Sequence, residues 1–184
     1  MNTKELSQFK KLYQEKFNYL CRQFLENHNS QAYLKKQTHL VDQLLVNVWQ
    51  SLSISKTIVL AAVGGYGRKE LFPFSDIDIL IVFEKKISEL DQEAISQFIT
   101  NCWDLGFKIG HSVRNIKQVK QEFNADISTA TNLIESRFLI GSSLVFERMN
   151  KIINISLSIK KFYKLKLQEQ ANRHRKFRDS AYQL

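Results

Sequence analysis

The chain has 184 residues, of which 43% are hydrophobic and 24% charged, and a formal net charge of +9. This composition is typical of a soluble globular protein and excludes a disordered chain, and the length is enough for one domain with a helical appendage. No apolar run approaches the ~18 residues that span a bilayer, so no membrane partner is expected. The N-terminus shows no signal-peptide core, and Cys21 and Cys102 have no metal-type spacing, which favours a reducing cytoplasm.

Amphipathic helices are predicted at the start of the chain, followed by two short strands. Apolar residues recur at helical spacing through residues 4–27 and again through 31–53. Residues 57–63, TIVLAAV, form an apolar run rich in β-branched residues, which is typical of a buried strand. This run ends at a Gly-Gly pair, and a second strand is predicted over 76–83.

The rest of the chain is predicted to be mainly helical. A helix over 88–105 begins with capping-type residues, and 107–114 is short enough for a third strand. From residue 117 the pattern is helical, with a break near 141–143 and a final helix over about 150–177. A small sheet embedded in helices places the chain in the α+β class, with a mixed sheet between N- and C-terminal helices.

The turn between the first two predicted strands, GGYGRKELFPFS, has the composition of a phosphate site. Gly64 and Gly65 directly follow a strand, where residues without a Cβ atom let the backbone turn sharply and offer N–H groups to an anion. Arg68 and Lys69 follow as two cations that can meet phosphate charge. Each part alone is weak evidence, because a Gly-Gly pair after a strand is commonly a simple turn.

Two carboxylates stand at the head of the second predicted strand. Asp76 and Asp78 are two residues apart, so in a strand they point to the same face and repel each other unless a cation lies between them. Mg²⁺ suits such a pair, because it prefers oxygen ligands and is usually completed by substrate phosphates. Together with the preceding turn, this pair predicts a site for a metal-bound nucleoside triphosphate; the alternative is a turn followed by solvated acids.

Two other phosphate-binding motifs are excluded. No G-x-x-x-x-G-K-[ST] sequence is present, and Gly65-x-Gly67 lacks the later glycine of the dinucleotide-binding fingerprint. A strand also follows where the long helix of that fingerprint should begin. The arrangement of strand, Gly-Gly, basic linker and Asp-x-Asp strand is therefore a different and more specific one.

This arrangement resembles the signature of the nucleotidyltransferase superfamily related to DNA polymerase β. More narrowly, GGYGRKELFPFSDIDILI is similar to the motif of the bacterial PII-protein uridylyltransferase/uridylyl-removing enzymes. Three later stretches also resemble that family: WDLGFKIGHSVR (103–114), DISTATNLIESRFLIG (126–141) and ANRHRKFRDSAYQL (171–184). The resemblance thus covers about residues 57–184.

The resemblance implies a polymerase β-like nucleotidyltransferase core over 56–145, with N-terminal helices over 1–55 and a C-terminal basic helix over 146–184. It also implies that the chain is a fragment, since the family's metal-dependent hydrolase and ligand-sensing domains are not in this sequence. The implied reaction moves UMP from UTP to a tyrosine of a PII signalling protein and releases pyrophosphate. A fragment that binds the nucleotide without turnover, and a transferase of another base or protein, such as an adenylyltransferase, remain alternatives.

The resemblance also implies roles for individual residues. Asp76 and Asp78 are expected to be catalytic and to hold Mg²⁺. The residues expected to bind the nucleotide are Gly64, Gly65, Arg68 and Ser75.

Several roles stay open. A third carboxylate is usual on a later strand in this superfamily, but KIGHSVR has no acid, and the nearest downstream acids, Asp126 and Glu135, both lie in a helical pattern. His111 is either a packing residue or a contact to phosphate or base. Arg114 either contacts the triphosphate or pairs with Glu135, and Arg137 is expected to pair with an acid.

Positive charge is concentrated at the end of the chain. Residues 160–184 hold eight Lys and Arg against two acids. A basic helix of this kind either binds nucleic acid or presents a solvated or intramolecular face, and the second interpretation is favoured because charged helix faces are common. Sequence-specific nucleic-acid binding is therefore not expected.

Overall fold

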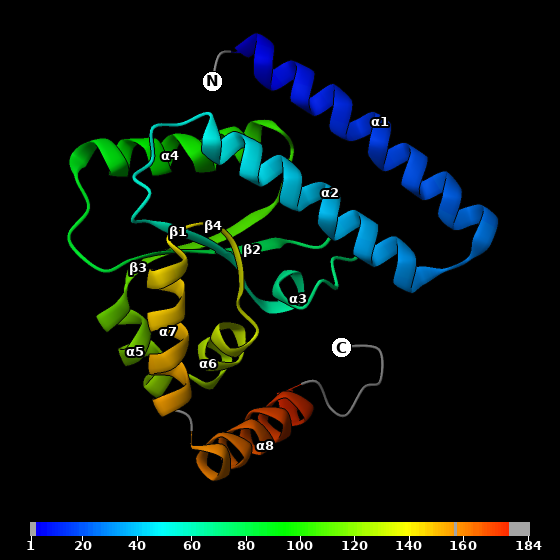
Figure 1. Cartoon of the computed structure of the whole chain (residues 1–184). Coiled ribbons are helices and arrows are strands. Elements are labelled where there is room, and N and C mark those ends of the chain that lie inside the picture. Colours follow the sequence, from blue (N-terminus) through cyan, green and yellow to red (C-terminus); the bar gives the residue numbers. More distant parts are fainter. Residues whose placement is uncertain (1–2, 157, 177–184) are drawn as a thin grey trace.

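The computed structural model describes residues 3–156 and 158–176. Its centre is a four-stranded mixed sheet in the order β3-β2-β1-β4 (Figure 1). β1 (Val59–Ala62) pairs antiparallel with β2 (Ile77–Phe83) on one side and with β4 (Arg137–Gly141) on the other. β2 pairs in parallel with β3 (Ile109–Asn115). The predicted α+β class with a small mixed sheet is confirmed.

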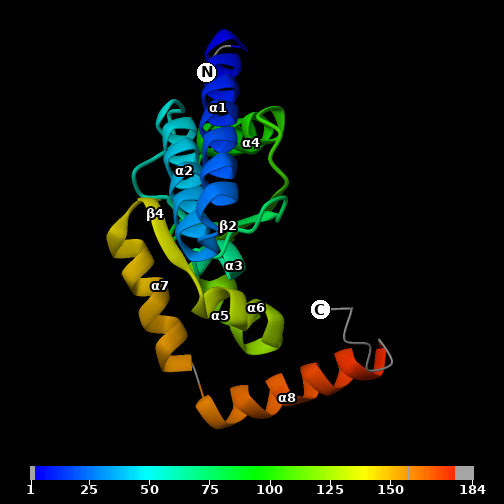
Figure 2. The same cartoon turned by 90° about the vertical axis from the view of Figure 1, so that its right-hand side faces the viewer.

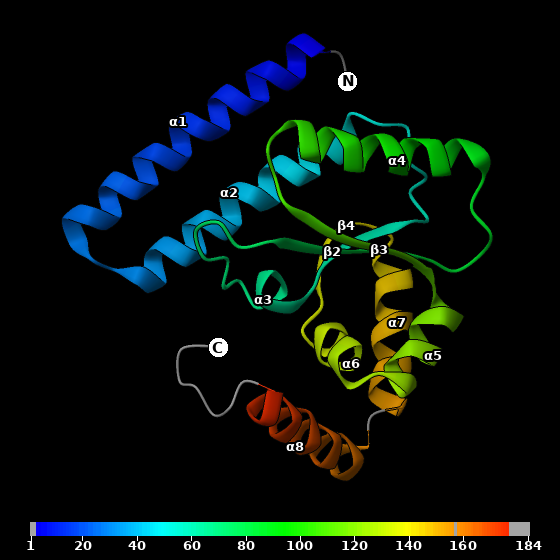
Figure 3. The same cartoon turned by 180° about the vertical axis from the view of Figure 1, so that it is seen from behind.

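Helices cover both faces of the sheet, which is why β2 is apolar along most of its length. One face is covered by α2 (Ser30–Gln50) and α4 (Glu89–Asp104) (Figure 3). The other is covered by α5 (Ile116–Ala125), α6 (Ile127–Ile134) and α7 (Ser143–Ser156).

Two further helices lie outside these layers. α1 (Thr3–Asn27) packs along α2 as a helical hairpin, and its apolar residues complete the core on that face. α8 (Ile159–Lys176) runs across the end of α7 and contacts α6 (Figure 2). None of the helices in residues 3–156 and 158–176 is long and apolar enough to cross a membrane.

Successive residues of β2 divide between the two cores, as expected for side chains that alternate across a strand. Ile77, Ile79 and Ile81 pack with α2 and α4. Leu80 and Val82 pack with α5, α6 and α7. Asp78 therefore points to the α6 side of the sheet, while Asp76, exposed, immediately precedes the strand.

Three differences separate the predicted elements from the observed ones. Residues 137–141 were predicted to be helical, but they form β4, because RFLIG is too short for its periodicity to distinguish helix from strand and its pairing with β1 decides. The final helix predicted over 150–177 is two helices, α7 and α8, and residue 177 lies outside the described residues. The Gly-Gly turn is a single helical turn, α3 (Gly64–Gly67).

Candidate active site

The carboxylate of Asp78 lies between two glycines from different elements. Asp78 faces Gly110 of β3 across the parallel ladder, and a Cβ atom at Gly110 would overlap Asp78 Oδ1. Asp78 Oδ2 lies 3.5 Å from the point that a Cβ atom at Gly64 would occupy. A Cβ atom at Gly110 would displace the carboxylate, so this glycine holds open the place where it sits, whereas a Cβ atom at Gly64 would only be in van der Waals contact with it.

Gly64 begins α3 with a φ of +58°, a left-handed conformation that glycine adopts without strain. Gly65 has no positive φ, so in this turn the need for glycine on conformational grounds belongs to Gly64. Gly65 has only ordinary neighbours: the nearest atoms to its Cβ position are Glu70 O at 3.7 Å and Arg68 Nη2 at 3.8 Å. The backbone of the turn is thus accessible to a ligand at Gly65.

Asn132 of α6 also reaches this place. Its Oδ1 lies 3.4 Å from the Cβ position of Gly64, beside the carboxylate of Asp78, and its side chain is exposed. Oxygen atoms of Asp78 and Asn132 therefore meet around Gly64, although the residues come from β2, α6 and α3. Such oxygens are the donors that Mg²⁺ prefers.

The electrostatics of the pair favour a cation. Burial raises the pKa of the Asp78 carboxyl above its ordinary value, and the charge of the nearby Asp76 raises it further. A raised pKa means that the ionised form is disfavoured where the carboxylate sits. A divalent cation would offset this penalty, so a metal ion between the two acids stays a prediction that the electrostatics favour.

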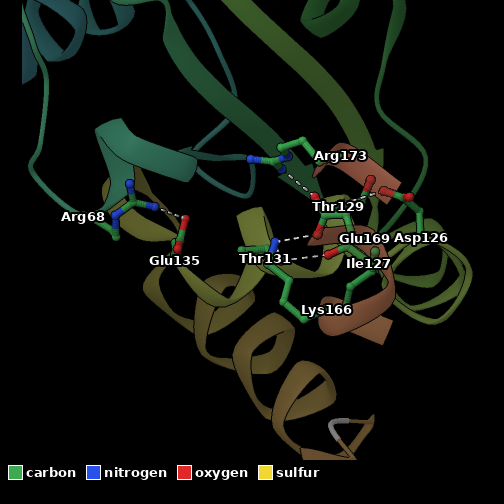
Figure 4. A network of polar contacts seen from close by, with 9 residues as sticks. All are labelled: Arg68, Asp126, Ile127, Thr129, Thr131, Glu135, Lys166, Glu169 and Arg173. Carbon is green, nitrogen blue, oxygen red and sulfur yellow. Dashed lines mark hydrogen bonds and ion pairs between the residues drawn. The ribbon is translucent and has the colours of Figure 1, made fainter. Parts of the chain in front are cut away.

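Arg68 lies beside the turn but is held by acids. Its Nε donates to Glu70 at 2.8 Å and its Nη1 donates to Glu135 at 2.6 Å (Figure 4). Glu135 caps the C-terminus of α6, so this ion pair ties α6 to α3. The guanidinium is half-exposed and lies close to Gly65, where a ligand phosphate would compete with the two carboxylates.

A second cluster, made of Arg137, Asp42 and Tyr66, connects α3 to α2 and β4. Arg137 forms a bidentate pair with Asp42 of α2, at 2.8 and 3.0 Å, and donates to the backbone oxygens of Tyr66 and Gly67. Its guanidinium lies 5.3 Å from the centre of the Tyr66 ring. Burial and the neighbouring Asp42 raise the pKa of Tyr66, whose hydroxyl donates to Asp42 at 2.6 Å. The predicted pairing of Arg137 with an acid is confirmed.

His111 and Arg114 lie outside the site. His111 pairs with Ile79 in the parallel ladder, so it points to the α2 and α4 side, where its ring packs edge-on near Trp103. Arg114 is on the same face as Asp78 but forms an ion pair with Glu122 of α5 rather than with Glu135. Packing and pairing within the fold thus account for both side chains.

The two acids considered as a third carboxylate have other partners. Asp126 caps α6, where it accepts a hydrogen bond from Thr129 N at 2.6 Å, and this bond lowers the pKa of Asp126. Asp126 is six residues from Asn132, about 9 Å along a helix. Glu135 pairs with Arg68. Within the described ranges, no three residues among His, Cys, Asp and Glu are grouped so as to hold a metal, and a third protein carboxylate stays unassigned.

Ser75 ends the loop before β2, and its backbone N–H donates to Phe72 O at 3.1 Å. The residue is exposed beside Asp76 and also lines a cavity beneath α1. The structure thus brings Gly64, Gly65, Asp78 and Arg68 around α3, with Asp76 and Ser75 at the adjoining end of β2.

Cations of α8 are used inside the fold. Lys166 donates to Thr131 of α6 at 3.2 Å and to Glu169 at 2.7 Å, and Arg173 donates to Glu169 at 2.8 Å (Figure 4). These bonds lower the pKa of Glu169. Part of the basic helix is therefore an intramolecular face behind α6, as the favoured interpretation of its charge predicted.

Gly110 and Asn132 are the site residues that sequence reasoning missed. An isolated glycine inside a predicted strand is a recognised signal of close approach by another group, and it was available in KIGHSVR. Asn132 carries no comparable signal, since an exposed Asn in a helix is ordinary. Its position beside Asp78 arises only from the packing of α6 against α3.

The site residues fall within the segment matched by a known family. A family model described as "Nucleotidyltransferase domain" matches residues 44–135, half of the chain, including Asp76, Asp78 and Asn132. The chain belongs to the nucleotidyltransferase domain family. This confirms the family resemblance predicted from the sequence, and the core described above is that of a nucleotidyltransferase domain.

Relatives of this nucleotidyltransferase domain carry one name, "Bifunctional uridylyltransferase/uridylyl-removing enzyme". The protein of Haemophilus influenzae (strain PittEE) is 41% identical over 155 residues, 82% of this chain and 18% of its own length. The protein of Hydrogenovibrio crunogenus is 43% identical over 156 residues, which are 82% of this chain and 17% of its own length. The protein of Vibrio campbellii is 40% identical over 176 residues, which are 92% of this chain and 20% of its own length. The chain spans about a fifth of the length of these curated relatives.

Proposed function

We propose that this domain binds UTP with Mg²⁺ and transfers UMP to a tyrosine hydroxyl of a PII signalling protein. The observation that carries the proposal is the carboxylate of Asp78, seated between Gly64 and Gly110 with Asp76 beside it. A half-buried acid with an exposed acid beside it, next to an accessible Gly-Gly turn, suits a metal-bound triphosphate. The names of the relatives support uridylyl transfer in particular.

Each residue has a role in this proposal. Asp76 and Asp78 would hold Mg²⁺, which neutralises charge on the triphosphate when bound. Gly64 and Gly65 would receive the β and γ phosphates against the backbone, and Arg68 would exchange its carboxylate partners for phosphate oxygens. Ser75 would contact the nucleotide from the adjoining loop.

The chemistry is a displacement at the α phosphorus. The tyrosine oxygen forms a bond to that phosphorus, the bond to the bridging oxygen of the β phosphate breaks, and pyrophosphate leaves. The hydroxyl proton is lost to solvent or to a neighbouring base. The protein contributes orientation and charge stabilisation, which carry most of the catalysis in phosphoryl transfer.

The domain is proposed to act in the cytoplasm, with a core over 56–145 flanked by helices over 1–55 and 146–184. Two other functions use the same site: nucleotide binding without turnover, and transfer of another nucleotide such as AMP. The accessible turn and the acid pair suit any nucleoside triphosphate, so the names of the relatives are what favour UTP.

The test is transfer of label. With [α-³²P]UTP, Mg²⁺ and purified PII protein, we expect radioactivity on the PII protein, and none on a PII variant in which the acceptor tyrosine is Phe. Label from [α-³²P]ATP in place of UTP would assign a different nucleotide. Binding of UTP without any transfer would leave the domain as a nucleotide-binding unit and contradict the proposed activity.

The turn gives a separate prediction. Gly65→Val is expected to weaken UTP binding at least about tenfold while the thermal midpoint changes little, because Gly65 has open surroundings and no positive φ. Gly64→Val, by contrast, is expected to lower the midpoint, since a β-branched residue is strained at a φ of +58°. Calorimetric titration with UTP and a thermal melt of each variant separate the two effects. Unchanged affinity of Gly65→Val would show that the phosphates lie elsewhere.

A further inference from the structure

A cavity of about 350 Å³ lies beneath α1, next to the proposed catalytic end of β2. Its walls come from α1, α2, the loop before β2 and the turn before β3. Ser75 and Ile77, the residues on either side of Asp76, both line it. The size is within the range of specific ligand pockets. We call it the α1 cavity.

The α1 cavity is aromatic with one polar end. Tyr13, Phe17 and Phe107 line it, with Tyr13 and Phe107 packed edge to face at 5.0 Å. Gln37 is 4% exposed; its Nε2 donates to Tyr13 Oη at 3.3 Å. Its Oε1 is buried and accepts no hydrogen bond from any described residue. Such an orphaned acceptor is costly unless an outside donor reaches it.

The mouth of the α1 cavity carries exposed rings in a strained loop. Phe72 and Phe74 are 57% and 89% exposed, and both border the cavity. Phe74 has a φ of +65°, which is a rare conformation for a bulky residue and is kept only where the surroundings impose it. The strained backbone at Phe74 exposes this aromatic ring to solvent immediately before Ser75 and Asp76. An exposed ring held in this way favours a surface that contacts another molecule.

The position of the α1 cavity relative to the sheet identifies which reactant it serves. In phosphoryl transfer the attacking and leaving oxygens lie roughly in line. The proposed pyrophosphate site is α3, at the end of β1, and β3 lies on the opposite side of β2. The acceptor hydroxyl is therefore expected to approach from the β3 side, and Phe107 and Lys108, which directly precede β3, line the α1 cavity.

We propose that the α1 cavity anchors a side chain of the acceptor protein: an aromatic residue with a hydrogen-bond donor, close to the residue that receives the nucleotide. Its ring would pack on the aromatic walls, and its donor would reach Gln37 Oε1 once the amide turns toward the cavity, because that oxygen is closed to solvent in the present conformation. Exposed Lys10 and Lys108 at the mouth suit carboxylates in the same segment of the acceptor. This inference rests on the proposed function, because it assigns the acceptor subsite of that reaction.

The test compares two affinities on the same chain: PII protein as the acceptor probe, and UTP with Mg²⁺ in the absence of PII protein. Phe74→Gly removes the ring at a φ that glycine adopts freely, so the fold should hold. Gln37→Leu keeps the volume and removes the acceptor. Each variant is expected to weaken PII binding about 10- to 100-fold and to leave UTP affinity within about twofold. Leu90→Ala, an exposed apolar change on α4, should alter neither.

The possible results separate this inference from the proposed function. Loss of UTP affinity in Phe74→Gly or Gln37→Leu, with PII binding kept, would assign the cavity to the nucleotide base and overturn the inference. Unchanged PII binding in both variants, or no PII binding by the parent chain, would also overturn it. A parent chain that binds PII protein but not UTP would contradict the proposed function alone, and the anchor would still be judged from the PII affinities.

Discussion

Replacing both Asp76 and Asp78 with Asn is expected to lower UTP affinity in the presence of Mg²⁺ by at least about 100-fold, or about 2.8 kcal/mol, because the metal that joins the acids to the triphosphate would be lost. The fold should remain, since no hydrogen bond or ion pair joins either carboxylate to a residue of 3–156 or 158–176. Calorimetric titration with UTP, with Mg²⁺ and with EDTA, measures the effect. A matched change of charge on α4, Asp104→Asn with Glu93→Gln, is the control, because both residues are exposed there.

The same double variant should be more stable than the parent in the absence of metal. The pKa of Asp78 is raised in the folded protein, so ionisation of this carboxyl group destabilises the fold at pH 7. Below the ordinary pKa of a carboxyl group, Asp78 is protonated in both the folded and the unfolded state, and the destabilisation is absent. We therefore expect a higher thermal midpoint for the variant at pH 7, and a difference that disappears near about pH 3, where Asp78 of the parent is protonated. Equal UTP affinity in the variant and the parent would show that the acids hold no metal.

The largest loss of stability is expected from Arg137→Met. The substitution keeps the unbranched aliphatic part of the side chain but leaves Asp42 facing Tyr66 without its cation. It also removes the bonds to the backbone of α3. Breaking a buried pair from one side costs about 3–5 kcal/mol, and we expect about 2–4 here because both side chains are 20% exposed. Urea unfolding followed by circular dichroism measures the change.

Arg148→Met is the matched control. Arg148 also pairs with a carboxylate through two short contacts, to Glu84, but its side chain is 60% exposed, so the loss should be at most about 1 kcal/mol. Since Arg137 fastens α3, its variant should also bind UTP more weakly, whereas Arg148→Met should not. Equal urea midpoints for the two variants would refute a scaffolding role for the cluster of Arg137, Asp42 and Tyr66.

Local sequence predicted a large part of the candidate site. The Gly-Gly turn and the Asp-x-Asp strand are adjacent in the chain, and the period of two in a strand is a local property, so a shared face for the acids followed directly. The alternation of helices with short strands, and the cap of α4 at Ser88, are likewise local in origin. The sequence also carried the family resemblance that the matching family model confirmed.

Tertiary structure decided which distant residues complete the site. The parallel register of β2 and β3 pairs Gly110 with Asp78 and places His111 on the other face of the sheet. A shift of the register by one residue would exchange the faces on which Gly110 and His111 lie. The contact of α6 with α3 brings Asn132 to Gly64. β4 forms because RFLIG pairs with β1, although its own periodicity does not distinguish a strand from a helix. Pairing between segments far apart in the chain depends on the packing of the whole core, which no local pattern contains.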